Sequence, residues 1–189
     1  MTLRSFSLMA AACALSVLCS ADTKTAKPRL AANNWQARLK QELPLLGHRN
    51  WIAVVDSAYP LQTSTGVETI ETDADQLEVV KSVLEEVSKA PHVRPVVFTD
   101  AELKFVPEFD AKGVTAYRDA LAKVLDKNDV QSLPHEAIIA KLDEAGKTFH
   151  VLVLKTRMTI PYTSVFIRLE CGYWPADAEK RLRDAMGSH

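Results

Sequence analysis

The feature that most constrains this chain is a run of five consecutive apolar residues, Trp51–Val55, which ends at Asp56. A continuous apolar run, in contrast to an alternating one, is typical of a strand that is buried on both faces. A strand of this kind needs neighbouring strands beside it and covering layers above and below. We therefore expect a central sheet.

The rest of the chain supplies partners for this strand. Short apolar or alternating segments predict four further strands, at Val67–Thr72, Pro95–Phe98, Phe149–Leu154 and Ser164–Leu169. Apolar spacings of three and four, together with capping residues, predict five helices. The first spans Trp35–Pro44 after an Asn33 or Asn34 cap, and the second follows an Asp73 cap and runs through Leu77, Val80, Leu84 and Val87. The other three are expected at Val114–Leu125, Pro134–Gly146 and Ala176–Met186. Because strands alternate with helices, the expected fold class is α/β, a layered sheet with flanking helices.

The N-terminal segment has the pattern of an export signal. Arg4 precedes an apolar run of 14 residues, Phe6–Cys19, and small residues follow it up to Ala21. We expect a signal peptide at 1–21, a flexible tether at 22–32, one domain at 33–175 and a C-terminal helical extension at 176–189. The protein would then be exported, periplasmic or secreted, with no stable membrane span in the mature chain. Of three cysteines only Cys171 would remain, so no internal disulfide is expected.

Charge and motif content exclude several classes of function. Twenty-three Lys and Arg residues balance 24 Asp and Glu residues, and no basic block occurs, so a nucleic-acid partner is not expected. The six glycines are too far apart for a phosphate-binding or dinucleotide-binding loop. No closely spaced His or Cys cluster predicts a metal site.

Three residues occupy positions at which catalytic or ligand-binding side chains are common. His48 follows Gly47 on the loop that enters the first strand, and His135 lies at the start of a helix. Asp56 follows the carboxyl end of a buried strand, a common ligand position in open α/β sheets, although an aspartate there is nearly as often a turn cap.

These residues also carry a resemblance. The segments Leu46–Asn50 (LGHRN), Asp56–Pro60 (DSAYP) and Pro161–Ile167 (PYTSVFI) occur in the order of the motifs of the ribose pyranase and fucose mutarotase family. The sequence resembles the fucose branch more closely, over roughly Trp35–Tyr173. The resemblance implies interconversion of the ring anomers of a monosaccharide, with no cofactor.

The family assigns roles to matching positions. Opening a hemiacetal ring needs one proton given to the ring oxygen and one removed from the anomeric hydroxyl. By resemblance, His48 is the catalytic histidine and Tyr162 supplies a second proton relay or a positioning hydroxyl. Asp56, His135 and Ser164 are implied to bind the sugar. The family's ring-like oligomers imply a homo-oligomer with sites near subunit boundaries.

Two substitutions depart from the family pattern. An acidic residue is usual two positions after the catalytic histidine, where this chain has Asn50, and the motif asparagine is Ser164. These changes keep an alternative open: an exported, non-catalytic sugar-binding or scaffold protein on the same fold. A third possibility is an oligomeric structural protein without a ligand.

Strand geometry adds a constraint of its own. Eight positions separate His48 from Asp56, and an extended chain of that length spans roughly 20 to 26 Å. One hexose cannot bridge that distance. Either the loop before Trp51 curls back, or one site combines His48 and Asp56 from different subunits.

Overall fold

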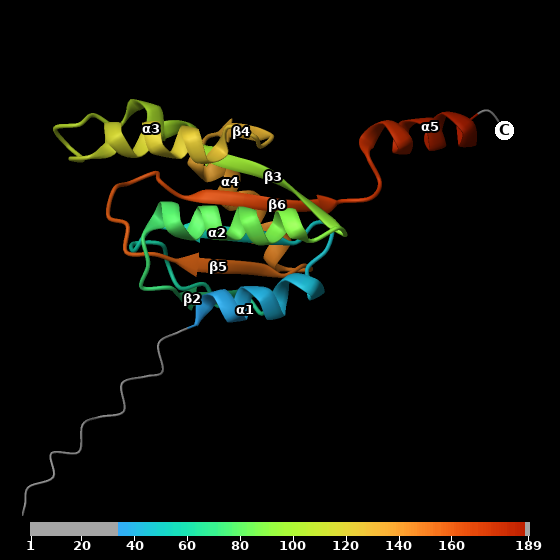
Figure 1. Ribbon diagram of the computed structural model, residues 1–189, viewed down its shortest axis with the longest axis horizontal. Coiled ribbons are helices and arrows are strands. Elements are labelled where there is room, and N and C mark those ends of the chain that lie inside the picture. The colour runs from blue at the N-terminus through green and yellow to red at the C-terminus, as the bar shows by residue number, and fades with distance from the viewer. Residues whose placement is uncertain (1–33, 188–189) are drawn as a thin grey trace, which may run out of the picture. The chain divides into compact units, whose positions relative to one another are not determined.

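The computed structural model describes residues 34–187, and the predicted signal peptide and tether lie outside them. Five α-helices and six strands follow one another with two short 3₁₀ helices, η1 and η2 (Figure 1). In chain order the elements are α1 (Trp35–Glu42), η1 (Leu43–Leu45), β1 (Trp51–Val55), β2 (Val67–Glu71), α2 (Gln76–Lys89), β3 (Val93–Asp100), η2 (Ala101–Phe105), α3 (Val114–Leu125), β4 (Val130–Leu133), α4 (His135–Gly146), β5 (Val151–Lys155), β6 (Val165–Cys171) and α5 (Ala176–Gly187).

The six strands form one mixed sheet in the order β2-β5-β1-β6-β3-β4. β1, β2 and β5 run parallel, β3 and β4 run parallel, and β6 pairs antiparallel with both β1 and β3. The carboxyl ends of the other five strands and the amino end of β6 therefore share one edge of the sheet. This arrangement brings the segment that precedes β6 next to the residues that follow β1 and β3.

Both faces of the sheet are covered, which confirms the predicted layered α/β class. Alternate residues of β1 point to opposite faces: Ile52 and Val54 join the core beneath α1, α2 and α3, whereas Trp51, Ala53 and Val55 join the core beneath α4. All five residues of β1 are buried, which explains the unbroken apolar run.

One predicted helix cap is wrong. The N-cap of α2 is Asp75, whose carboxylate accepts from the backbone N–H of Leu77 and Glu78. Asp73 stands in the turn before it with a left-handed backbone, at φ 49°. Both aspartates precede the helix, and the turn geometry decides which carboxylate reaches the free amides.

The apolar face of α2 also differs from the prediction. Its fully buried apolar residues include Val79 and Val83, whereas Leu77 and Leu84 are only partly buried. The prediction missed β4, a four-residue edge strand of sequence VQSL that is mostly exposed. A short edge strand needs no apolar face, so periodicity gives little sign of it.

The C-terminal helix α5 exists as predicted, and none of its residues is buried. Within residues 34–187, the helices all fall short of the length and apolar character needed to span a membrane.

Candidate functional site

A cavity of about 540 Å³ opens at the edge of the sheet where β1, β3 and β4 end. Its walls come from three segments that are distant in the sequence: the turn 56–60 after β1 together with Gln62, the first turns of α4, and the loop 159–162 before β6. The antiparallel course of β6 places that loop beside the ends of β1 and β3. Asp56, His135 and Tyr162, which are far apart in the sequence, all line this cavity.

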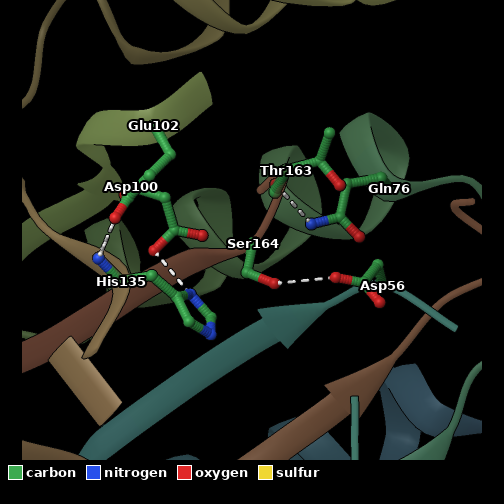
Figure 2. A network of polar contacts seen from close by, with 7 residues as sticks. All are labelled: Asp56, Gln76, Asp100, Glu102, His135, Thr163 and Ser164. Carbon is green, nitrogen blue, oxygen red and sulfur yellow. Dashed lines mark hydrogen bonds and ion pairs between the residues drawn. The ribbon is translucent and has the colours of Figure 1, made fainter. Parts of the chain in front are cut away.

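Asp56 lies on the cavity wall at the end of β1. Its Oδ1 accepts from the backbone N–H of Ala58 at 2.8 Å, so it stabilises the turn as well as facing the cavity. Ser164 donates from Oγ to Asp56 Oδ2 at 3.4 Å (Figure 2). Ser164 is only 2% exposed and is not among the residues that line the cavity, so its place is that of a support for Asp56.

His135 enters the cavity from the first turn of α4 and is paired with Asp100. Its Nδ1 lies 3.1 Å from Asp100 Oδ1 at the end of β3 (Figure 2). Asp100 is 3% exposed, its Oδ2 has no hydrogen-bond partner among the described residues, and burial raises the pKa of this carboxyl to about 6. The pair fixes the imidazole and leaves its Nε2 side for a ligand.

Glu102 holds the start of α4 in place. Pro134, at the N-cap position, has no side-chain oxygen to offer, and both carboxylate oxygens of Glu102 instead accept from the backbone N–H of His135 at 3.0 Å. Figure 2 shows one of these two bonds. A carboxylate at this end of a helix is also favoured by the helix dipole. The position of His135 is therefore set at both its backbone and its ring.

Tyr162 lines the cavity from the loop before β6. Its ring meets the His135 ring edge-on, with the centroids 5.7 Å apart and the planes at 81°. The residue is 39% exposed and adopts a left-handed backbone, at φ 60°. Backbone strain of this kind in a non-glycine residue persists only when the surrounding structure enforces it.

The enforcing structure is a buried hydrogen-bond network behind Tyr162. The carbonyl oxygen of Thr163 accepts from Gln76 Nε2 at 3.0 Å and from the Tyr117 hydroxyl at 2.7 Å (Figure 2 shows the Gln76 bond). Gln76 also donates to the Val54 carbonyl at 3.0 Å and accepts from Thr156 Oγ1 at 2.6 Å. The fully buried Gln76 therefore ties the end of β1 to the start of β6.

Tyr59 adds an aromatic, largely buried surface to the cavity. Burial, with a smaller contribution from nearby carboxylates, raises the pKa of its hydroxyl to about 12. A phenol with so high a pKa stays protonated near neutral pH and acts as a hydrogen-bond donor or a packing surface. It is therefore a poor candidate for the base.

His48 lies elsewhere. It precedes β1, at the opposite end of that strand from Asp56, and lines a second, more open groove of about 750 Å³. Its Nδ1 is 2.8 Å from Glu170 Oε2. One protomer thus brings together Asp56, His135 and Tyr162 but not His48, and the loop before Trp51 does not curl back to the cavity.

Four of these residues do not stand out in the sequence patterns: Gln76, Asp100, Glu102 and Glu170. Asp100 had a usable signal, because it follows an apolar strand just as Asp56 does. Glu102 and Glu170 have no local signal, since their partners are distant in the sequence.

One group of residues has the composition of a metal site. Glu42, Glu68 and His150 present ligand atoms within 4.8 Å of one another. The guanidinium of Arg38 contacts both carboxylates and already supplies the positive charge there. The cavity itself contains no comparable group among residues 34–187.

Comparison with solved structures gives matches to sugar-related proteins. Bacillus subtilis RbsD complexed with D-ribose matches with a TM-score of 0.51 and 18% identity, covering 71% of this chain and 92% of that protein. FucU from Bifidobacterium longum matches with a TM-score of 0.47 and 12% identity, covering 71% and 94%. The fucose mutarotase of Streptococcus pneumoniae in complex with L-fucose matches with a TM-score of 0.45 and 19% identity, covering 70% and 91%.

The RbsD match, at 18% identity, shows a likeness of fold alone. No family model matches the sequence, and no curated protein matches it either. Fold alone does not fix an activity.

Proposed function

We propose that this protein interconverts the ring anomers of a fucose-like or ribose-like monosaccharide, as a mutarotase or pyranase. The observation that carries the proposal is the cavity in which Asp56, His135 and Tyr162 converge. Its volume lies in the range of small-molecule sites. The shared fold with RbsD, a protein solved with D-ribose, supports a sugar as the ligand.

The groups present suit acid–base opening of a hemiacetal. His135, held through Nδ1 by Asp100, offers Nε2 to exchange a proton with the ring oxygen or the anomeric hydroxyl. Tyr162 presents a hydroxyl beside it, and the Asp56 carboxylate can accept from sugar hydroxyls. This chemistry requires no redox cofactor.

His48, the catalytic histidine that the family resemblance implies, reaches the same sugar only from another molecule. We therefore propose a homo-oligomer in which the groove around His48 in one protomer faces the cavity of its partner. The separation of His48 and Asp56 along β1 is the observation behind this step.

Exchange NMR of the anomeric protons of L-fucose and D-ribose tests the activity. The wild-type protein is expected to accelerate exchange, and His135→Ala and His48→Ala are each expected to slow it by about 10²- to 10⁴-fold. The control is Glu86→Gln. Glu86 pairs with Lys40 and Lys89, away from both the cavity and the groove around His48. Wild-type protein that leaves the exchange rate unchanged would refute the proposal.

The alternative function has to be separated from catalysis by experiment, because a single protomer lacks His48 at its cavity. A sugar-binding or scaffold protein without catalysis would show saturation transfer from protein to sugar and no faster exchange. The same two NMR experiments therefore separate the alternatives.

Export also remains a proposal, based on residues 1–21 alone. We expect mass spectrometry of the protein from its natural source to find a chain that begins at Asp22. An intact Met1 would contradict the proposed cleavage.

A further inference from the structure

Glu170 is the carboxylate that contacts His48. It stands near the end of β6, where one oxygen lies 2.8 Å from His48 Nδ1 and the other lies 2.9 Å from Arg168 Nη2. Its side chain is only 18% exposed, whereas that of His48 is 50% exposed. A largely buried carboxylate held by two partners has little freedom to move, so it can hold the more exposed imidazole.

Asn50, two positions after His48 on the same loop, is occupied with other contacts. Asn50 accepts from the backbone N–H of Gly47 at 2.7 Å and donates to the His150 carbonyl at 3.2 Å. Asn50 therefore shapes the loop. Within residues 34–187, Glu170 is the carboxylate that pairs with His48.

Arg168, two positions before Glu170 on β6, supports Glu170. It faces Trp51 across the β1–β6 pair, and its guanidinium carbon lies 5.5 Å from the centre of the Phe98 ring. An arginine that is packed on an aromatic ring and bound to a carboxylate has a fixed direction. Arg168, Glu170 and His48 thus form a chain of contacts that leads from the sheet to the groove.

We infer that Glu170 is a positioning residue for His48. A carboxylate accepts a hydrogen bond and cannot donate one while ionised, so the proton of the neutral imidazole is placed on Nδ1. Nε2 then carries the lone pair and is the atom of His48 that exchanges protons with a ligand. The inference rests on the proposed function only in giving Nε2 a sugar proton to transfer.

The tautomer of His48 can be measured without any activity. Long-range ¹H–¹⁵N correlation spectra at about pH 8, where a free imidazole is neutral, distinguish Nδ1–H from Nε2–H. We expect the Nδ1–H form in the wild-type protein and a mixture shifted toward Nε2–H in Glu170→Ala. An Nε2–H form in the wild-type protein, or a tautomer that Glu170→Ala leaves unchanged, would overturn the inference.

The kinetics of anomer exchange provide a second, independent test of the role of Glu170. Glu170→Gln keeps the size of the side chain but removes its charge, and it is expected to lower the exchange rate at saturating sugar by at least about tenfold, with little change in sugar affinity or melting temperature. Glu86→Gln is a matched control, since that carboxylate is 21% exposed and ion-paired elsewhere. An unchanged rate, or a rate loss that the control shares, would count against the role of Glu170.

These results separate the two proposals. Wild-type protein without anomer exchange refutes the proposed function, and the tautomer measurement still decides whether Glu170 holds His48. Wild-type exchange with an Nε2–H tautomer refutes the role of Glu170 and leaves the proposed function standing.

Discussion

At the residue scale, Tyr162 presents its hydroxyl to the cavity, and its backbone takes part in the fold of the loop before β6. Its ring packs edge-on against His135, while its left-handed backbone is held by the bonds to Thr163. Tyr162→Phe removes only the hydroxyl. We expect anomer exchange to slow with little change in thermal stability, measured by exchange NMR and thermal melts of the same samples. A markedly lower melting temperature with normal activity per folded molecule would assign Tyr162 to the fold alone.

Asp56 also serves both the turn and the cavity, and an isosteric change separates the two roles. Asp56→Asn keeps an oxygen for the Ala58 N–H and removes the charge. Sugar binding is expected to weaken by about 1.5 to 3 kcal/mol, the scale of a charged hydrogen bond. Titration calorimetry measures the loss, and Asp126→Asn on the exposed end of α3 is the control. Equal affinities in both variants would remove Asp56 from the site.

Asp100 makes the stability of the fold depend on pH. Its folded-state pKa of about 6 lies above the value of about 3.9 for an unfolded chain, so the folded protein keeps a proton that the unfolded chain loses. Stability from this group is present below about pH 4 and is lost as the pH rises through about 6.

Asp100→Asn abolishes that titration. Relative to wild type, the free energy of unfolding of the variant is expected to rise by about 1 to 2 kcal/mol between pH 4 and 6. Urea unfolding at several pH values measures the difference. A difference that stays constant across the window would show that the Asp100 carboxyl titrates normally.

At the scale of secondary-structure elements, the cavity depends on β6 running antiparallel between β1 and β3. Its start then lies beside the ends of both neighbours, and the buried Gln76 of α2 bonds to both sides of that junction. One helix residue thus fixes the relative positions of Asp56 and Tyr162.

Removal of the Gln76 hydrogen bonds at that junction is expected to destabilise the fold. Gln76→Leu leaves buried partners at Val54, Thr156 and Thr163 without one of their hydrogen bonds, and we expect a loss of about 2 to 4 kcal/mol in the free energy of unfolding. Gln131→Leu, on the exposed strand β4, is the control in urea unfolding experiments. A loss no larger than that of the control would show that the network contributes little.

At the scale of the whole molecule, the cavity and the groove around His48 lie at opposite ends of β1. This separation predicts a site that two protomers share. If each site combines His48 from one protomer with His135 from its partner, two inactive variants can complement each other. A mixture of His48→Ala and His135→Ala, unfolded and refolded together, is expected to regain anomer exchange that neither variant shows alone. Light scattering reports the oligomeric state, and a mixture that stays inactive while forming mixed oligomers would contradict a shared site.

The sequence determined the elements and part of the cavity. Apolar runs, helical spacing and the proline before α4 identified β1, α3, α4 and the turn at Asp56 because these signals are local. A strand buried on both faces must be apolar throughout, and a helix that packs on a sheet repeats its apolar residues every three or four positions. The motif residues pointed to Tyr162 and His135 by resemblance, and the structure places them side by side.

Only the tertiary structure decided the strand order, the edge strand β4 and the partners of the two histidines. Asp100 reaches His135 because β3 ends and α4 begins at the same edge of the sheet, and Glu170 reaches His48 because β6 runs antiparallel to β1. Such contacts join segments that are far apart in the chain. Hydrophobic periodicity encodes which face of an element is buried, but it does not encode which element lies beside it.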